Sequence, residues 1–326
     1  MKDAAPRLEI RNLSVAVDTD EGQARILDRT HLELMPGSIH GVVGESGCGK
    51  STLMRAILGI LPRRGRATEG NVLLDGRDLL TLAPSVFRTE IRGGQIGFIP
   101  QDPYQAFNPV FRVGTQLLET TRAKAGDNGH DAKADIIALL KAVQLPDPER
   151  ALDRYPHQFS GGQRQRLLIA AALASSPAVV LADEPTTALD VTTQAQILKL
   201  LRGLAEARGL SMLFVTHDFG VVAQLCDTVT VMYAGQTVES GPVARVLAAP
   251  LHPYTKMLLA CHPDRNATLS GIPGAVSSPL RPPSGCRFHP RCPSARSECS
   301  KAIPRTSVHA ERQKVSCVLY EEEERV

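Results

Sequence analysis

The chain has 326 residues, of which 43% are hydrophobic and 22% charged, the composition of an ordinary globular protein with room for about two domains. Its 37 basic and 34 acidic residues leave a formal net charge of +3, which gives no indication of a nucleic-acid partner bound by bulk charge. There is no apolar run of 18 or more residues and no apolar signal-peptide core at the N-terminus, so we expect a cytosolic protein with mostly reduced thiols.

The N-terminal part of the chain is predicted to be rich in strands. Residues 7–17 and 26–35 alternate partly between apolar and polar side chains, and residues 39–43 are predicted to form a short buried strand. A helix is predicted over 51–61. Residues 70–82 predict a hairpin arm, with Asp75-Gly76 as its turn.

Strands and helices alternate over most of the remaining chain. Strands are predicted at 96–99, 178–182 and 211–215, a mainly helical region at 105–170 with a polar insert at 126–129, a helix at 191–207, and more β-structure at 228–239. This alternation is typical of an α/β fold with a mostly parallel sheet. Residues 262–305 are rich in Pro, Ser and Arg, so a domain boundary is predicted near 250–265.

A glycine-rich loop follows the predicted strand at 39–43. It reads Gly44-Glu45-Ser46-Gly47-Cys48-Gly49-Lys50-Ser51, which fits the phosphate-binding pattern G-x-x-x-x-G-K-[ST] (a P-loop). Its glycines allow backbone N–H groups to point into a concavity around phosphates, and the next helix adds its N-terminal dipole. We expect Lys50 to contact the β- and γ-phosphates and Ser51 to ligate Mg²⁺.

Two segments farther along suit the same chemistry. Ser160-Gly161-Gly162-Gln163 is a short glycine-rich turn that opens a helix, whose N–H groups and dipole suit a phosphate. The apolar strand at 178–182 ends in Asp183 and Glu184. One carboxylate there can hold Mg²⁺ through water, and the second can polarise an attacking water molecule.

The three segments in this order resemble the ATP-binding cassette of ABC transporters. The resemblance implies an α/β P-loop NTPase with a RecA-like core, an antiparallel β subdomain and a helical subdomain at about 105–170. It implies an ATPase domain over 1–255 and a small, loop-rich C-terminal domain over 256–326. In this family two subunits enclose ATP between the P-loop of one and the Ser-Gly-Gly-Gln turn of the other, so an isolated monomer is expected to hydrolyse ATP slowly.

The resemblance also implies a role for each matching residue. Asp183 corresponds to the metal partner and Glu184 to the catalytic base. Gln101 resembles the glutamine that touches Mg²⁺ and joins the core to the helical subdomain, and His217 resembles the switch histidine near the γ-phosphate. Leu189-Asp190 resembles the loop that meets the partner subunit. The expected nucleotide-binding residues are Gly44, Glu45, Ser46, Gly47, Cys48, Gly49, Lys50, Ser51, Thr52, Asp183, Ser160, Gly161, Gly162 and Gln163.

One position departs from the family pattern. The family places an aromatic residue near the end of the first strand, where it stacks on adenine, and the matching position here is Val17. Base–aromatic stacking is worth about 1–3 kcal/mol in single-stranded nucleic-acid complexes. Either ATP binds more weakly, or another side chain covers the base; a core role for Val17 is the alternative.

Several short motifs resemble the ATPases of oligopeptide, dipeptide and nickel importers, with the dipeptide type as the nearest match. They are Gln101-Asp102-Pro103, Phe107-Asn108-Pro109-Val110-Phe111, Tyr155-Pro156-His157-Gln158, Met232-Tyr233-Ala234-Gly235 and His252-Pro253-Tyr254-Thr255. The resemblance implies a peripheral subunit on the cytoplasmic face of the membrane. Its partners would be two membrane permease subunits, a second homologous ATPase and an extracytoplasmic substrate-binding protein, with no nucleic acid. Peptides are the expected cargo, and nickel or a metal chelate is the alternative.

Four cysteines gather in the C-terminal segment, at Cys286, Cys292, Cys299 and Cys317. A loop-rich segment of this kind buries little apolar area, and four thiolates suit Zn²⁺ or a [4Fe–4S] cluster. The C-x₂₋₄-C spacing of zinc sites is absent, and dipeptide-importer relatives are associated with a [4Fe–4S] cluster at matching positions. Free thiols or a disulfide remain open, although a reducing compartment disfavours the disulfide.

Two other classes of function fit parts of the sequence. A non-transport ABC protein of DNA repair would carry long coiled-coil or zinc insertions, and one of the ribosome would carry two cassettes; neither feature is present. A redox regulator with a vestigial ATPase core is disfavoured by the intact Lys50, Asp183, Glu184 and His217.

Overall fold

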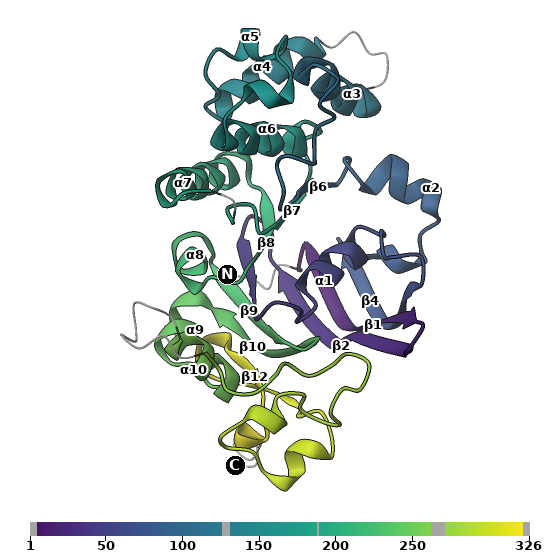
Figure 1. Cartoon of the computed structure of the whole chain (residues 1–326), viewed down its shortest axis with the longest axis vertical. Helices are drawn as coiled ribbons and strands as arrows, with labels where there is room; N and C mark the ends of the chain where they lie inside the picture. Colours follow the sequence, from purple (N-terminus) through teal and green to yellow (C-terminus); the bar gives the residue numbers. More distant parts are fainter. Residues whose placement is uncertain (1–4, 126–130, 188, 262–270, 322–326) are drawn as a thin grey trace. The chain divides into compact units, whose positions relative to one another are not determined.

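The computed structural model describes residues 5–125, 131–187, 189–261 and 271–321 (Figure 1). It divides into two compact units. Unit 1 contains Met1–Met35, Ile39–Thr81 and Val215–Val326, and unit 2 contains Pro36–Ser38 and Leu82–Phe214. Each unit is described by itself.

An antiparallel sheet forms one part of unit 1. Its strands lie in the order β2-β1-β4-β5, with β1 at Leu8–Thr19, β2 at Gly22–Leu34, β4 at Gly65–Leu74 and β5 at Arg77–Asp78. Apolar residues such as Leu8, Ile10 and Leu13 are buried on one side. The β4–β5 turn has positive φ at Asp75 (48°) and Gly76 (80°), as a tight hairpin requires, so the predicted turn is confirmed.

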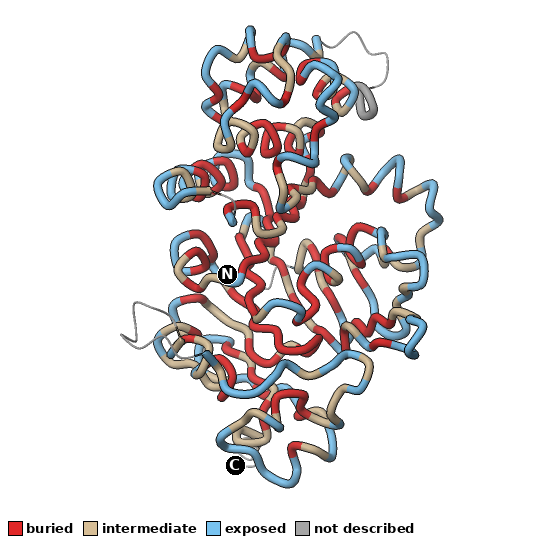
Figure 2. Tube along the Cα trace, viewed as in Figure 1, coloured by how far each residue is buried: buried red, intermediate tan, exposed pale blue. Residues whose placement is uncertain are grey.

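The second sheet of unit 1 has the order β11-β12-β10-β9-β3. Its strands are β3 (Ile39–Val43), β9 (Thr228–Tyr233), β10 (Gln236–Pro242), β11 (Thr306–Val308) and β12 (Lys314–Ser316). β3 pairs with β9 in parallel, and the other pairs are antiparallel. Every residue of β3 is buried, His40 included, as expected of a strand inside a sheet (Figure 2).

Helices and short turns complete unit 1. The helices are α1 (Lys50–Ile57), α8 (Phe219–Leu225), α9 (Val243–Ala248) and α10 (Pro253–Ala260). Single 3₁₀ turns occur at Leu79–Thr81, His289–Arg291, Ser297–Ser300, Ala310–Arg312 and Val318–Tyr320.

Unit 2 combines three strands with most of the helices. The strand order is β8-β7-β6, with β6 (Ile96–Ile99) parallel to β7 (Val179–Asp183), and β8 (Ser211–Thr216) ending in unit 1. The helices are α2 (Pro84–Val86), a π-helical turn (Phe87–Ile91), α3 (Val113–Ala125), α4 (Ala132–Ala142), α5 (Pro148–Ala151), a 3₁₀ turn (Pro156–Gln158), α6 (Gly161–Leu173) and α7 (Val191–Arg208).

These elements confirm the expected α/β fold class and most predicted boundaries. The strands expected at 39–43 and 96–99 have those bounds, whereas the helix expected at 51–61 is the shorter α1. The polar insert at 126–129 lies outside the described residues. β11 and β12 were not predicted, and they pair the C-terminal segment with β10. Since this segment belongs to unit 1, a separate C-terminal domain over 256–326 stays a prediction.

A buried histidine links β3 to β9 inside unit 1. His40 is 4% exposed, and its ring nitrogens lie 2.7 and 2.8 Å from the Oγ1 atoms of Thr228 and Thr230. Burial lowers the pKa of His40 to about 4, with a smaller opposing effect of Glu33. The folded chain therefore holds His40 neutral at pH values where the unfolded chain binds a proton.

We expect His40 to make the fold sensitive to acid. Its folded pKa lies below its unfolded value, so this contribution to stability is complete above about pH 6.5 and is lost as the pH falls toward 4. At pH 5 the loss is about 2 kcal/mol relative to pH 7.5. Urea denaturation at both pH values should show a smaller loss for His40→Gln than for wild type. His157→Gln, at an exposed histidine, should behave as wild type; equal losses in all three proteins would contradict this role.

Candidate nucleotide site

The P-loop lies between β3 and α1 and is packed tightly against its own unit. A Cβ atom on Gly44 would lie 2.2 Å from the carbonyl oxygen of Met232. Gly49 has a φ of 104°, and a Cβ atom there would lie 2.7 Å from Cδ2 of Leu27. Only glycine fits these two positions, the first because of space and the second because of both space and conformation.

Lys50 is buried at the start of α1, where it is held by the loop itself. Its Nζ donates to the carbonyl oxygens of Gly44 (2.7 Å) and Glu45 (3.2 Å). A phosphate placed in the loop offers this ammonium stronger, charged acceptors. Ser51 is exposed and Thr52 half-buried in the first turn of α1, whose backbone N–H groups lack intrahelical acceptors.

Tyr254 and Arg291 contact the P-loop, and sequence reasoning missed both contacts. The backbone N–H of Glu45 donates to the Tyr254 hydroxyl (2.9 Å), and the Glu45 carboxylate pairs with Arg291 (2.9 Å). Tyr254 belongs to a motif that served only to identify the branch. Arg291 lies 246 positions from Glu45, and no local pattern reports such a pair.

The predicted metal partner and base lie at the end of β7 in unit 2. Val179 to Ala182 are fully buried, whereas Asp183 and Glu184 are half-buried. Glu184 has a φ of 44°, an uncommon conformation for a side chain of its size. The Glu184 carboxylate accepts a hydrogen bond from Oγ1 of Thr187 (3.1 Å). Strained residues of this kind are found at functional sites, and the sequence did not predict the strain.

The Ser-Gly-Gly-Gln turn caps α6, as its sequence predicts. Ser160 Oγ accepts from the N–H of Gln163 (3.3 Å), and Gln163 Oε1 accepts from the N–H of Ser160 (3.1 Å). This reciprocal pair fixes the direction of the helix N-terminus. The N–H groups of Gly161 and Gly162 belong to the first turn, which leaves them available to an anion by helix geometry.

The same turn lies against the start of α7. Asp190 caps α7 by accepting from the N–H (3.0 Å) and Oγ1 (2.8 Å) of Thr193. A Cβ atom on Gly162 would lie 2.8 Å from Cγ2 of Thr193. Unit 2 therefore brings together two segments that the family resemblance assigns to the contact with a second subunit.

The other predicted residues are divided between the units. The P-loop and His217 belong to unit 1, whereas Gln101, the Ser-Gly-Gly-Gln turn, Asp183 and Glu184 belong to unit 2. Gln101 and His217 are exposed, two residues after β6 and one residue after β8. Val17 is half-buried in β1, opposite Ala24 of β2. The roles given to these residues stay predictions.

The four C-terminal cysteines line one small cavity, together with Phe288, His289 and Leu319. Cys286, Cys299 and Cys317 are buried and Cys292 is half-buried. Burial raises the pKa of the Cys286 thiol to about 12 and also raises the pKa values of Cys292 and Cys317. Within the described ranges, however, no three His, Cys, Asp or Glu side chains form a group that could hold a metal ion. The thiols meet at one cavity, but the expected metal centre is not confirmed.

Comparison with known proteins agrees with this geometry. The family described as "ABC transporter" matches residues 27–187, and "Oligopeptide/dipeptide transporter, C-terminal region" matches residues 238–299. A peptide import ATP-binding protein of Brucella abortus is 46% identical over 303 residues, 92% of this chain and 91% of its own. The dipeptide transport ATP-binding protein DppD of Bacillus subtilis is 41% identical over 319 residues, 97% of this chain and 95% of its own.

Solved structures show the same fold. A dimeric, post-hydrolysis state of the ATP-binding cassette MJ0796, bound to ADP and Pi, matches with a TM-score of 0.64 and 28% identity. The match covers 72% of this chain and 98% of the cassette. Fold, loop and cap thus define an ATP-binding cassette, and the chain belongs to the ATP-binding proteins of the ABC transporter family. Within that family its C-terminal region matches that of oligopeptide and dipeptide transporters, and its relatives include a dipeptide transport ATP-binding protein. In the part of the chain that the structure describes, no helix has the length and apolar character to cross a membrane.

Proposed function

We propose that the chain hydrolyses ATP at the cytoplasmic face of a membrane to drive the uptake of peptides. The observation that carries the proposal is the P-loop of unit 1, in which a buried ammonium is held by backbone carbonyls that a phosphate can replace. The names of the relatives support a peptide cargo. Nickel or a metal chelate remains the alternative cargo, because no residue of this chain is expected to contact the substrate.

We propose a role for each residue that matches the family motifs. Gly44–Thr52 bind the phosphates, with Mg²⁺ held by Ser51, Gln101 and, through water, Asp183. Glu184 accepts a proton from the attacking water, and His217 orients the γ-phosphate. The Ser160–Gln163 turn completes the site of a second, homologous ATPase subunit, which in turn completes this one. The cap on α6 supports this role, because it fixes the helix N-terminus, whose N–H groups suit an anion.

Glu184→Gln tests the function and its mechanism together. Loss of a general base slows hydrolysis by about 10²-fold or more, so the assembled transporter should stay in an ATP-bound, closed dimer. Cells that carry this variant should lose uptake of a labelled dipeptide. Glu206→Gln makes the same change at an exposed position of α7 and should keep both activities. Normal hydrolysis in Glu184→Gln would remove this residue from the role of base. Uptake of nickel instead of peptide by cells that carry the wild-type protein would favour the alternative cargo.

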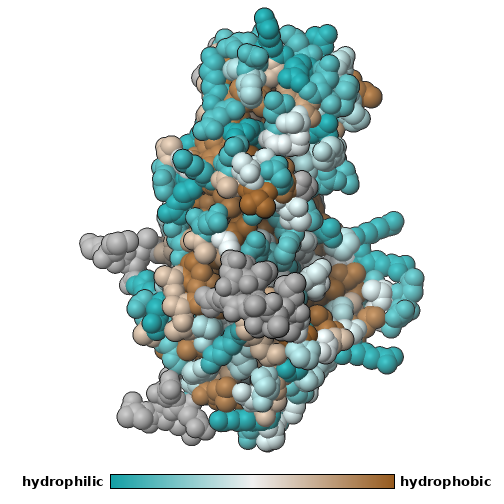
Figure 3. All heavy atoms as spheres, turned by 60° about the vertical axis from the view of Figure 1, so that its left-hand side comes forward, coloured by the Kyte–Doolittle hydropathy of each residue, from teal (hydrophilic) through white to brown (hydrophobic). Residues whose placement is uncertain are grey.

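Docking on the permease subunits is the second part of the proposal. The loop between β6 and α3 exposes three large apolar side chains, Tyr104 (59% exposed), Val110 (70%) and Phe111 (53%). Much of the face drawn in Figure 3 is hydrophilic, although hydrophobic patches interrupt it, and Val191 at the start of α7 is a further exposed valine of unit 2 (84%). Exposed apolar residues in a hydrophilic surface favour a protein contact, which here would be the cytoplasmic loops of the membrane subunits.

Phe111→Asp should therefore release the chain from its membrane subunits. An anchor residue at an interface contributes about 2 kcal/mol or more, so the variant should co-purify poorly with the permease. Val308→Asp places the same charge on β11, at a valine that is 58% exposed, and serves as the control. Equal recovery of permease with both variants would count against this docking surface.

We further propose that Cys286, Cys292, Cys299 and Cys317 hold a [4Fe–4S] cluster, with Zn²⁺ as the alternative. The support is chemical: four thiols line one buried cavity, and iron–sulfur clusters are held by four cysteine thiolates. The raised pKa values of the thiols oppose the thiolate state in the metal-free chain, because burial disfavours a bare thiolate. A cation would compensate that charge.

Metal analysis after anaerobic purification tests the cluster. We expect about four irons per chain with broad visible absorbance, both lost in Cys286→Ser/Cys299→Ser together with a lower melting temperature. Cys261→Ser changes a half-exposed cysteine after α10 and should retain the iron. One zinc per chain would select the alternative. Absence of metal, or a double variant with unchanged iron and stability, would refute the proposal.

A further inference from the structure

Arg291 is an almost fully buried arginine that joins the C-terminal segment to the P-loop. Its side chain is 5% exposed. The guanidinium donates to the carbonyl oxygens of Ile272 (2.9 Å) and Pro273 (2.9 Å), and to the Tyr233 hydroxyl (3.2 Å). Its other partner is the Glu45 carboxylate, which it contacts with both terminal nitrogens (2.9 and 3.3 Å). A two-pronged contact of this kind fixes orientation as well as charge.

The charge of Glu45 gives this contact a consequence for nucleotide binding. Glu45 lies inside the loop that is proposed to surround anionic phosphates, and its side chain is only 23% exposed. An unpaired carboxylate there would repel ATP, with little screening by solvent. Lys50 donates to loop carbonyls, whereas Arg291 pairs with the Glu45 carboxylate directly. Arg291 therefore supplies the positive charge that neutralises the Glu45 carboxylate.

Aromatic packing makes the same contact rigid. The Tyr254 hydroxyl accepts from the backbone N–H of Glu45, and the Tyr254 ring lies 4.7 Å from Tyr233 and 5.2 Å from Phe288. The residues around the Arg291–Glu45 contact are thus held in place by packing. A group that positions a binding site needs such support.

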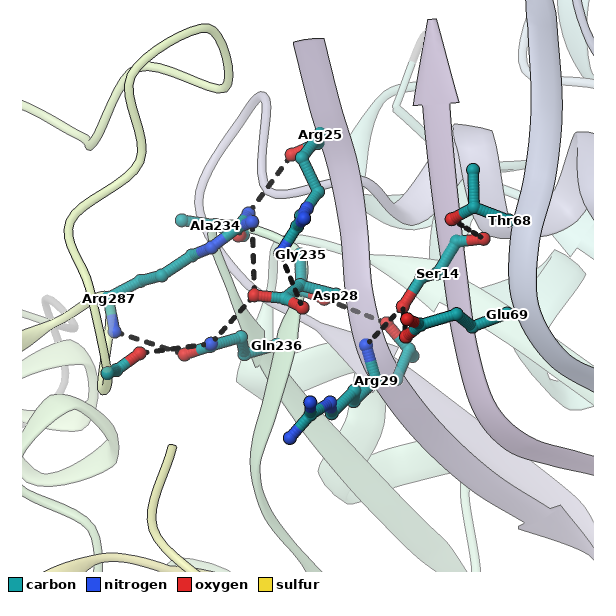
Figure 4. A network of polar contacts seen from close by, with 12 residues as sticks. Ser14, Arg25, Asp28, Arg29, Thr68, Glu69, Ala234, Gly235, Gln236 and Arg287 are labelled. Carbon is teal, nitrogen blue, oxygen red and sulfur yellow. Dashed lines mark hydrogen bonds and ion pairs between the residues drawn. The ribbon is translucent and has the colours of Figure 1, made fainter. Parts of the chain in front are cut away.

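The position of Arg291 in the chain connects it to the cysteine cavity. It directly precedes Cys292, one of the four cysteines of that cavity. A second buried arginine, Arg287, directly follows Cys286 and donates through Nη1 to the carbonyl oxygens of Ala234 and Arg25, as Figure 4 shows. The N–H of Gly235, in the same turn, donates to the carbonyl oxygen of Cys48 in the P-loop (2.8 Å). Arg291 therefore contacts the loop directly, whereas Arg287 contacts the Ala234–Gly235 turn that donates to the loop.

We propose that Arg291 is a positioning residue for ATP: it neutralises and orients Glu45 so that the P-loop accepts a triphosphate, and it thereby links the conformation of the cysteine segment to ATP affinity. The inference rests on the proposed phosphate-binding role of the P-loop. It assigns a function in the nucleotide site to a segment outside the cassette motifs.

A double-mutant cycle between Arg291 and Glu45 tests this inference, with the dissociation constant of a fluorescent ATP analogue as the readout on the full chain. Arg291→Gln should weaken binding about tenfold when Glu45 is present. In the Glu45→Gln background the same change should cost less than about twofold, because no carboxylate is left to expose. Arg291→Lys keeps the charge and loses the two-pronged contact, so it should recover part of the affinity.

Two further variants separate the possible failures. Arg281→Gln, at an exposed arginine of the same segment, should bind as wild type. Lys50→Ala should abolish binding, and its failure to do so would refute the proposed role of the P-loop. If Lys50→Ala abolishes binding but Arg291→Gln leaves it unchanged, the positioning role of Arg291 is wrong. An equal loss from Arg291→Gln in both Glu45 backgrounds, with a lower melting temperature, would show a merely structural residue and would also overturn the inference.

Discussion

The lack of space around the P-loop is the constraint on which unit 1 depends. Gly44 lies against Met232 near the end of β9, Gly49 lies against β2, and the carbonyl oxygen of Cys48 accepts from the N–H of Gly235 in the turn after β9. Backbone carbonyl oxygens form part of these walls, that of Met232 beside Gly44 and that of Ile26 beside Gly49, and the Leu27 side chain adds to the second. Backbone atoms cannot move aside by a rotamer change, so the loop has little room to relax. A phosphate cradle built from backbone N–H groups needs this rigidity, because its donors must point at the ligand before the ligand arrives.

Local signals predicted much of this architecture. β3 and β6 are short, mostly apolar segments, and the β4–β5 turn contains an Asp-Gly pair. These are properties of neighbouring residues. The Ser160 turn, which was predicted to open a helix, likewise makes its capping contacts within four residues. Each of these features is decided by contacts that a contiguous pattern records, and the family motifs are contiguous patterns of the same kind.

Distant pairs escaped prediction for the opposite reason. β12 pairs with β10 across more than 70 positions, and Arg291 pairs with Glu45 across more than 200. The local sequence pattern of neither segment indicates which distant residue it contacts. The positive φ of Glu184 could not be predicted from the sequence either. A strained backbone is held by the surrounding structure and is not favoured by its own residue type. The gathering of four cysteines at one cavity was expected from their clustering in sequence, but their arrangement there was not.

The energetics of the Arg291–Glu45 pair argue that it is kept for more than stability. A buried ion pair loses hydration on both partners, and its net contribution to folding is often near zero compared with an apolar replacement. The Arg291 side chain donates to acceptors on four different residues. These contacts define the position of the guanidinium far more closely than stability demands. A contact that is costly to bury and closely specified, and that places a cation beside a carboxylate in the phosphate loop, fits the control of ligand binding. By reciprocity, any such coupling acts in both directions: ATP in the loop must stabilise the cysteine segment in the arrangement that favours ATP.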